Sequence, residues 1–193
     1  MGYTEMMIEG RNVIVAIVDT GIDYLNENFM DEFSDIDTIM SIINETVEEM
    51  KSYGNTQWDN NYPNNETFIN DIKNDSLYVY EDNNYIKGFV CIDNNEAKEY
   101  KNLNWSLYEK CMVTHRMAIN SKFRNSGIAS KLMDFCEELA LKNGVRYLKA
   151  DTYSLNIKMN SFFKKRGYKF IGKVFFTGKE KPFYVYEKIL KEK

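Results

Sequence analysis

Several features that define large classes of protein are missing from this sequence of 193 residues. Positive charge is not in excess: 25 Lys and Arg against 29 Asp and Glu give a net charge of −4, which argues against a general nucleic-acid binder. No apolar run approaches the roughly 20 residues that a membrane-spanning helix needs. The run at 13–18 is too short for the apolar part of a signal peptide. These absences predict a cytoplasmic protein with neither nucleic-acid nor membrane partners.

Residues that bind metals are also scarce. The sequence has one histidine and three cysteines, Cys91, Cys111 and Cys136, which lie far apart. No Cys-x-x-Cys pair and no Cys/His spacing typical of zinc occurs, so we expect no metal site. Each cysteine lies among apolar residues, which predicts buried free thiols and fits a reducing compartment.

What the sequence does contain is a regular alternation of predicted strands and helices. Its length favours one domain, and a hydrophobic content of 44% is enough for a packed core. The expected helices are about 34–53, 65–73, 128–142 and 156–166, and the expected strands are about 13–18, 77–80, 85–92, 106–119, 145–152, 168–176 and 183–190. This order predicts an α/β (mixed α+β) fold in which helices pack on a mixed sheet. The unit at 111–152 should be a parallel strand–helix–strand crossover.

The most informative segment lies between the strand that ends at Ile119 and the helix that follows. It reads Arg124-Asn125-Ser126-Gly127-Ile128-Ala129, and the helix after it repeats apolar residues at helical spacing. Glycine lets a backbone approach a ligand closely, and the N–H groups at the start of a helix attract anions. A strand, a glycine loop and a helix therefore predict a site for a cofactor that carries phosphate. The alternative is a helix-start glycine in a loop that binds nothing.

Two blocks of the sequence resemble the GNAT superfamily of acetyl-CoA-dependent N-acetyltransferases. The segment 124–129 is similar to the family's signature, Gln/Arg-x-x-Gly-x-Gly/Ala, between a strand and a long helix. Asn156-Ile157-Lys158-Met159 followed by Lys164-Lys165-Arg166-Gly167-Tyr168 is similar to its second block. The resemblance covers about 33–190 and leaves 1–32 as an N-terminal extension of open structure. It implies a central mixed, mostly antiparallel twisted sheet with helices on both faces.

The resemblance also implies an activity, namely transfer of the acetyl group of acetyl-CoA to a primary amine by direct attack on the thioester. The acceptor is then a small-molecule or peptide amine, and no metal takes part. Asn156 has a second interpretation as a helix N-cap. The residues that the resemblance assigns to acetyl-CoA are Met117, Ala118, Ile119, Arg124, Asn125, Ser126, Gly127, Ile128, Ala129, Ser130 and Asn156.

The sequence departs from the family at the position that usually supplies a general acid, because Phe163 stands where a tyrosine is typical. Tyr153 and Tyr168 are alternative acids, although tyrosines more often serve in packing. His115 and Glu109 are the candidate bases on the expected strand 106–119. A hydrogen-bonded core histidine and a solvated carboxylate are the competing interpretations. The absent tyrosine keeps open a non-catalytic module that only binds acetyl-CoA.

Aromatic residues of the link between the first two helices are the candidate acceptor site. The resemblance suggests that Trp58, Tyr62 and Phe68 line the acceptor pocket, and the alternative is that each anchors a long loop. The acidic balance of the chain favours a cationic amine. Exposed terminal strands leave a homodimer open.

The N-terminal segment 15–23 does not look like the start of a GNAT domain. It resembles the segment around the catalytic aspartate of subtilisin-like proteases, with Asp19 at the matching position. The histidine and serine motifs of those proteases are absent, so a working protease is not expected. We expect a strand and a tight turn that either joins the edge of the sheet or replaces the first strand of a GNAT domain; a fused fragment is the alternative.

Overall fold

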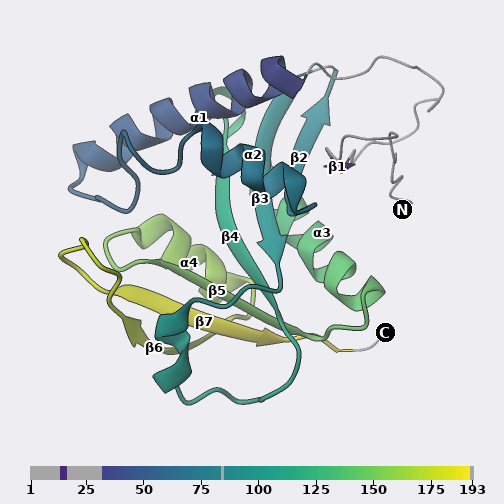
Figure 1. Ribbon diagram of the computed structural model, residues 1–193, viewed down its shortest axis with the longest axis vertical. Helices are drawn as coiled ribbons and strands as arrows, with labels where there is room; N and C mark the ends of the chain where they lie inside the picture. The colour runs from purple at the N-terminus through teal and green to yellow at the C-terminus, as the bar shows by residue number, and fades with distance from the viewer. Residues whose placement is uncertain (1–13, 17–31, 84, 192–193) are drawn as a thin grey trace. The chain divides into compact units, whose positions relative to one another are not determined.

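The computed structural model describes residues 14–16, 32–83 and 85–191 (Figure 1). The helices are α1 (Glu32–Ser52), α2 (Asn65–Lys73), α3 (Ile128–Lys142) and α4 (Ile157–Lys165), with two short 3₁₀ helices, η1 (Lys98–Asn102) and η2 (Ser121–Phe123). The strands are β1 (Ile14–Ala16), β2 (Leu77–Asp82), β3 (Tyr85–Asp93), β4 (Met112–Ile119), β5 (Tyr147–Tyr153), β6 (Lys169–Val174) and β7 (Phe183–Ile189). Within these described ranges, no helix has the length and apolar character needed to cross a membrane.

The strands follow one another in the sheet in the order β1-β2-β3-β4-β5-β7-β6. The pairs β2·β3, β5·β7 and β6·β7 are antiparallel, whereas β1·β2 and β4·β5 are parallel. The predicted mixed, mostly antiparallel sheet is therefore confirmed. The parallel pairing of β4 with β5, on either side of α3 in the chain, also confirms the expected crossover.

Two compact units make up the chain. The first comprises the described residues within 1–48, 59–91 and 116–135, and the second those within 49–58, 92–115 and 136–193. β3, β4, α1 and α3 each contribute residues to both units. The domain boundary predicted at 32/33 stays a prediction, because most of 1–32 lies outside the described residues.

In the first unit, helices pack on both faces of the hairpin formed by β2 and β3. Phe68 of α2 packs its ring edge-on against Phe89, with 5.3 Å between ring centroids. Tyr78 of β2 packs against Phe135 of α3 at 4.8 Å. Phe89 pairs with Val79, the neighbour of Tyr78 in the strand, and successive strand residues point to opposite faces. α2 and α3 therefore cover opposite faces, as expected.

In the second unit, α4 packs on the sheet of β5, β7 and β6. Phe163 of α4 lies 5.3 Å from the ring of Tyr186 in β7. A separate core lies around Trp105 and Tyr147, whose ring centroids are 6.4 Å apart, and this core includes the buried Cys111. All three cysteines are free and buried, which confirms that prediction.

The strand predicted at 106–119 is shorter than expected, because β4 begins only at Met112. Residues before it are held by side chains. The backbone N–H of Ser106 donates to a carboxylate oxygen of Glu187 at 3.0 Å, and the hydroxyls of Ser106 and Tyr147 donate to the same carboxylate. Burial alone would raise the pKa of Glu187, but these hydrogen bonds outweigh burial and lower it.

The N-terminal strand is present in part. Residues Ile14–Ala16 form β1, which pairs in parallel with β2 at the edge of the sheet, from Ile14 opposite Tyr78 to Ala16 opposite Tyr80. This confirms the expected edge strand for those residues. Asp19, the residue that resembles a protease aspartate, lies outside the described residues.

Candidate functional site

The glycine loop after β4 has a conformation that few residues other than glycine adopt. Arg124 donates from Nε to the carbonyl of Ile119 at 3.3 Å and so closes the loop onto the end of the strand. Asn125 has φ +61° and Gly127 has φ +85°, both in the left-handed region. A Cβ at Gly127 would meet no atom within 4 Å. Glycine is therefore required here for the backbone angle and leaves open space above the loop.

α3 begins directly after this loop, at Ile128. The N–H of Lys131 donates to the carbonyl of Gly127 at 3.1 Å, which is the first bond of the helical ladder. The N–H groups before it, on Ile128, Ala129 and Ser130, have no intrahelical acceptor by the geometry of an α-helix. These N–H groups and the positive end of the helix dipole can hold a phosphate.

A second glycine sets how closely β3 approaches the loop. A Cβ at Gly88 would lie 2.7 Å from Cδ1 of Ile119 and 3.0 Å from the carbonyl oxygen of Ala118, and it would also contact Ile128 at 3.4 Å. The N–H of Asn120 donates to the carbonyl of Lys87 at 2.9 Å. β3 thereby fixes the end of β4 and the start of α3, the two elements that flank the glycine loop.

His115 of β4 lies in the second unit and forms an ion pair with Asp93 at the end of β3. Its Nε2 lies 2.9 Å from Oδ1 of Asp93, and both side chains are about one-fifth to one-quarter exposed, at 24% and 21%. Burial alone would raise the pKa of Asp93, but hydrogen bonds from His115 and Asn95 lower it. A half-buried imidazole held by a carboxylate can accept a proton while keeping a fixed orientation.

A partly buried carboxylate, Asp151 of β5, lies in the same unit. The hydroxyl of Tyr100 donates to its Oδ2 at 2.5 Å. Burial raises the pKa of Asp151, while Tyr100 and the charge of His115 act in the opposite direction. The pKa of Tyr100 is raised well above its usual value by burial and by Asp151. Tyr100 and Asp151 therefore form a hydrogen-bonded pair in this unit.

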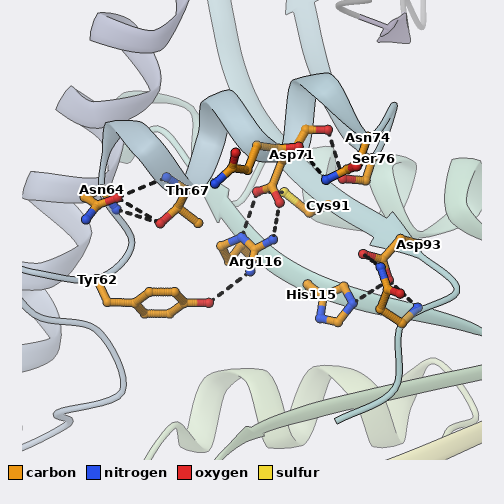
Figure 2. A network of polar contacts seen from close by, with 12 residues as sticks. Tyr62, Asn64, Thr67, Asp71, Asn74, Ser76, Cys91, Asp93, His115 and Arg116 are labelled. Carbon is orange, nitrogen blue, oxygen red and sulfur yellow. Dashed lines mark hydrogen bonds and ion pairs between the residues drawn. The ribbon is translucent and has the colours of Figure 1, made fainter.

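Arg116, the residue after His115, is the centre of a network in the first unit (Figure 2). Its Nη2 and Nε donate to the two carboxylate oxygens of Asp71 of α2 at 2.6 and 3.0 Å, and its Nη1 donates to the hydroxyl of Tyr62 at 2.9 Å. The thiol of Cys91 donates to Asp71 at 3.3 Å. Burial would lower the pKa of Arg116, but Cys91, Tyr62 and Asp71 outweigh it and raise that pKa.

Two of the predicted catalytic residues lie in other surroundings than the sequence suggested. Glu109 was expected on the strand of His115, but it precedes β4 and pairs with Arg146 through contacts of 3.0 and 3.3 Å. Tyr153 is 1% exposed, and its hydroxyl accepts from the N–H of Lys181 at 3.0 Å and from Thr56 at 3.2 Å. Each therefore has a structural task, and catalysis by either stays a prediction.

Phe163 and Tyr168 pack against one another in the core of the second unit, with ring centroids 5.2 Å apart. Both are buried, and burial raises the pKa of Tyr168 well above its usual value. The position that usually carries the family's acid is thus filled by an apolar ring.

Trp58 is 5% exposed, which agrees with the alternative that it anchors its loop, and Phe68 is fully buried. Tyr62 is 42% exposed and remains accessible to a ligand.

Asn156 is the N-cap of α4, where its Oδ1 accepts from the N–H of Met159 at 3.2 Å. Its role toward acetyl-CoA stays a prediction beside this confirmed cap.

Comparison with known proteins agrees with this geometry. The sequence matches the acetyltransferase (GNAT) family over residues 39–168, so the chain belongs to that family. No curated protein sequence matches the chain. Among the residues that the structure describes, no group of three or more His, Cys, Asp or Glu is placed to hold a metal ion.

Solved structures of bacterial acetyltransferases are similar to this chain. A candidate acetyltransferase from Staphylococcus aureus Mu50 is 31% identical with a TM-score of 0.65, covering 84% of this chain and 97% of that one. A GNAT-family acetyltransferase from Streptococcus agalactiae 2603 is 27% identical with a TM-score of 0.71, covering 83% and 92%. A Salmonella typhimurium protein solved with its cofactor acetyl-CoA is 14% identical with a TM-score of 0.60, covering 86% and 94%, and this likeness shows the fold alone.

Proposed function

We propose that this GNAT-family protein is an N-acetyltransferase that moves the acetyl group of acetyl-CoA to a primary amine. The observation that carries the proposal is the loop from Arg124 to Ala129, with its left-handed Gly127 at the start of α3. Coenzyme A presents a pyrophosphate, which suits the N–H groups of this helix start. The Salmonella structure holds the same cofactor on the same fold.

The residues of the cofactor site then have separate tasks. The N–H groups of the first turn of α3 hold the pyrophosphate, and Arg124 and Lys131 add positive charge beside it. The backbone of Met117, Ala118 and Ile119 runs along the pantetheine arm. Gly88 keeps β3 close enough to hold those three residues in place.

In the reaction, the nitrogen of a neutral amine attacks the thioester carbonyl carbon, the carbon–sulfur bond breaks, and coenzyme A leaves as the thiolate. The amine gives up a proton, and we assign its acceptance to His115, directly or through a water molecule. Asp93 holds the imidazole in place through the 2.9 Å contact between Oδ1 and Nε2. The thiolate takes up a proton from solvent, since Phe163 has none to give.

A cationic amine of a small molecule or a peptide fits the net charge of −4, because the acidic chain attracts positive charge. The buried aromatic ring of Phe163 favours one competing function, a module that binds acetyl-CoA without turnover. Binding and turnover are measured separately to distinguish the two.

Calorimetric titration with acetyl-CoA tests the cofactor site. We expect saturable binding of one acetyl-CoA per chain, weakened by added salt because the contacts to phosphate are charged. Absence of binding at near-millimolar acetyl-CoA would overturn both the enzyme and the binding module.

A further inference from the structure

The hydroxyl of Tyr62 is oriented by a largely buried ion pair, and among the described residues it donates its hydrogen to no acceptor. Arginine has no acceptor, so in the 2.9 Å contact Arg116 donates and the Tyr62 oxygen accepts. The hydroxyl hydrogen of Tyr62 is therefore directed away from Arg116. Within the described part of the chain, Arg116 is the hydrogen-bond partner of this hydroxyl.

Arg116 is itself firmly placed. Its two bonds to Asp71, at 2.6 and 3.0 Å, form the bidentate arrangement that fixes a guanidinium plane. The side chains of Arg116 and Asp71 are only 14% and 11% exposed. The carboxylate of Asp71 balances the charge of the guanidinium, so the pair orients the Tyr62 hydroxyl without adding net charge.

The backbone of Tyr62 is held on both sides. Before it, Tyr62 exchanges backbone hydrogen bonds with Asp59 at 2.9 and 3.3 Å, and Asp59 Oδ1 accepts from the N–H groups of Asn61 and Tyr62. After it, Asn64 begins α2 with a capping box to Thr67, with contacts of 3.0 and 3.3 Å (Figure 2). An exposed ring on a fixed backbone with a fixed hydroxyl is preorganised for binding.

We infer that Tyr62 recognises the acceptor by donating a hydrogen bond to an oxygen close to the reacting amine, as in an amino-acid amide or an amino acid. This inference rests on the proposed acetyl transfer and names the class of acceptor. An O–H donor binds a carbonyl or carboxylate oxygen, whereas an alkylamine has no acceptor besides the nitrogen that reacts. Asp71 and Arg116 are positioning residues that act through Tyr62.

The test compares primary amines of equal length with and without an oxygen. Glycinamide and β-alaninamide carry a carbonyl, glycine and β-alanine carry a carboxylate, and ethylamine and propylamine carry neither. Thiol release from acetyl-CoA is measured for each with the full chain. We expect kcat/KM for at least one oxygen-bearing class to exceed that of the alkylamines by about tenfold, the effect of one good hydrogen bond.

The variant Tyr62→Phe removes only the hydroxyl. We expect the preferred oxygen-bearing class to lose about tenfold in kcat/KM, with the alkylamines and the dissociation constant of acetyl-CoA unchanged. The control is Tyr85→Phe, at a tyrosine that is 67% exposed and outside the network. Asp71→Asn should raise the KM of the same amines through a less firmly held Arg116, with little change in kcat.

If Tyr62→Phe slows the amides, the recognised oxygen is a carbonyl; if it slows the amino acids, the oxygen is a carboxylate. Either result supports the inference. A Tyr62→Phe enzyme that keeps its preference overturns the inference. So does a wild-type enzyme that binds acetyl-CoA but acetylates none of the oxygen-bearing amines, and in that case the cofactor site still stands. If the wild-type chain does not bind acetyl-CoA, the proposed function is overturned instead.

Discussion

At the scale of single residues, Gly127 is the position where backbone conformation and binding are most directly linked. Its φ of +85° disfavours any residue with a Cβ by about 1–2 kcal/mol, while the space around it is open. We expect Gly127→Ala to weaken acetyl-CoA binding about tenfold, since roughly 1.4 kcal/mol corresponds to that factor. Calorimetry measures the change.

The matched control is Gly178→Ala, in the turn between β6 and β7. Gly178 has φ +80° and equally open surroundings, so the backbone penalty is the same. It should lower stability by a similar amount and leave acetyl-CoA affinity intact. Equal losses of affinity in the two variants would mean that the loop does not hold the cofactor.

His115 should matter for turnover rather than for binding. We expect His115→Ala to lower kcat/KM for the amine by about 100-fold, the lower end of what a general base contributes. Acetyl-CoA affinity should stay the same. An unchanged kcat/KM across the pH range would exclude the histidine as the proton acceptor.

Asp93 gives the protein a pH-dependent stability. Its pKa is lowered in the folded state, so its hydrogen bonds stabilise the fold above the ordinary value of 3.8 and are lost as pH falls through the lowered pKa. We expect Asp93→Asn to lower the free energy of unfolding at pH 7 by about 1–2 kcal/mol. Denaturant titrations should show this difference shrinking below about pH 4. Asp37→Asn, at an exposed residue, is the control. A difference that does not shrink at all as the pH falls below 3.8 would contradict the assignment.

The role of a residue could be predicted where its neighbours in sequence determine it. It could not be predicted where the residue contacts partners far away in the chain. Gly127 and the Asn156 cap follow from the few residues around them. His115 was identified from its type, but its partner Asp93 lies 22 residues away, and Asp71 lies 45 residues from Arg116. No spacing in the sequence connects such pairs. Trp58 was expected in a pocket because an aromatic in a polar loop has the same pattern whether it anchors the loop or binds a ligand.

At the scale of elements, the position of β3 against the glycine loop depends on Gly88. A Cβ there would lie 3.0 Å from the Ala118 carbonyl, which cannot move without β4, and overpacking of this kind costs about 1–3 kcal/mol. We expect Gly88→Ala to lower Tm by about 2–4 °C for each kcal/mol of unfolding free energy that is lost. It should also weaken acetyl-CoA binding. Thermal unfolding and calorimetry measure the two effects.

Gly172→Ala in β6 provides the comparison. A Cβ at Gly172 would lie 2.8 Å from Cδ2 of Leu103, the tip of a flexible side chain that can rotate away. This variant should lose less stability and keep its affinity for acetyl-CoA. If Gly88→Ala behaved in the same way, the close approach of β3 would have no part in the cofactor site.

Helices with caps and strands with clear alternation were predicted within a few residues, as α2 at 65–73 illustrates. The strand at 106–119 was predicted to begin too early. The backbone N–H of Ser106 is instead held by Glu187, a residue 81 positions away. Local propensity gives no information on such a contact.

At the scale of the whole molecule, the sheet and the GNAT family agree with an acetyl-CoA-dependent acetyltransferase, and the amine acceptor is the part that needs experiment. The resemblance predicted the fold because two motif blocks and the order of elements are both readable in sequence. The sequence does not identify the acceptor, because the residue that we propose to recognise it, Tyr62, is oriented by Arg116, which lies 54 positions away in the chain.

Amine-dependent release of coenzyme A is the measurement that tests the central claim most directly. The full chain is incubated with acetyl-CoA and a panel of primary amines, thiol release is followed, and the products are analysed by mass spectrometry. The account predicts that thiol release requires the amine, that the amine gains one acetyl group, and that Gly127→Ala slows the reaction at limiting acetyl-CoA. Binding of acetyl-CoA with no amine-dependent release across the panel would contradict it.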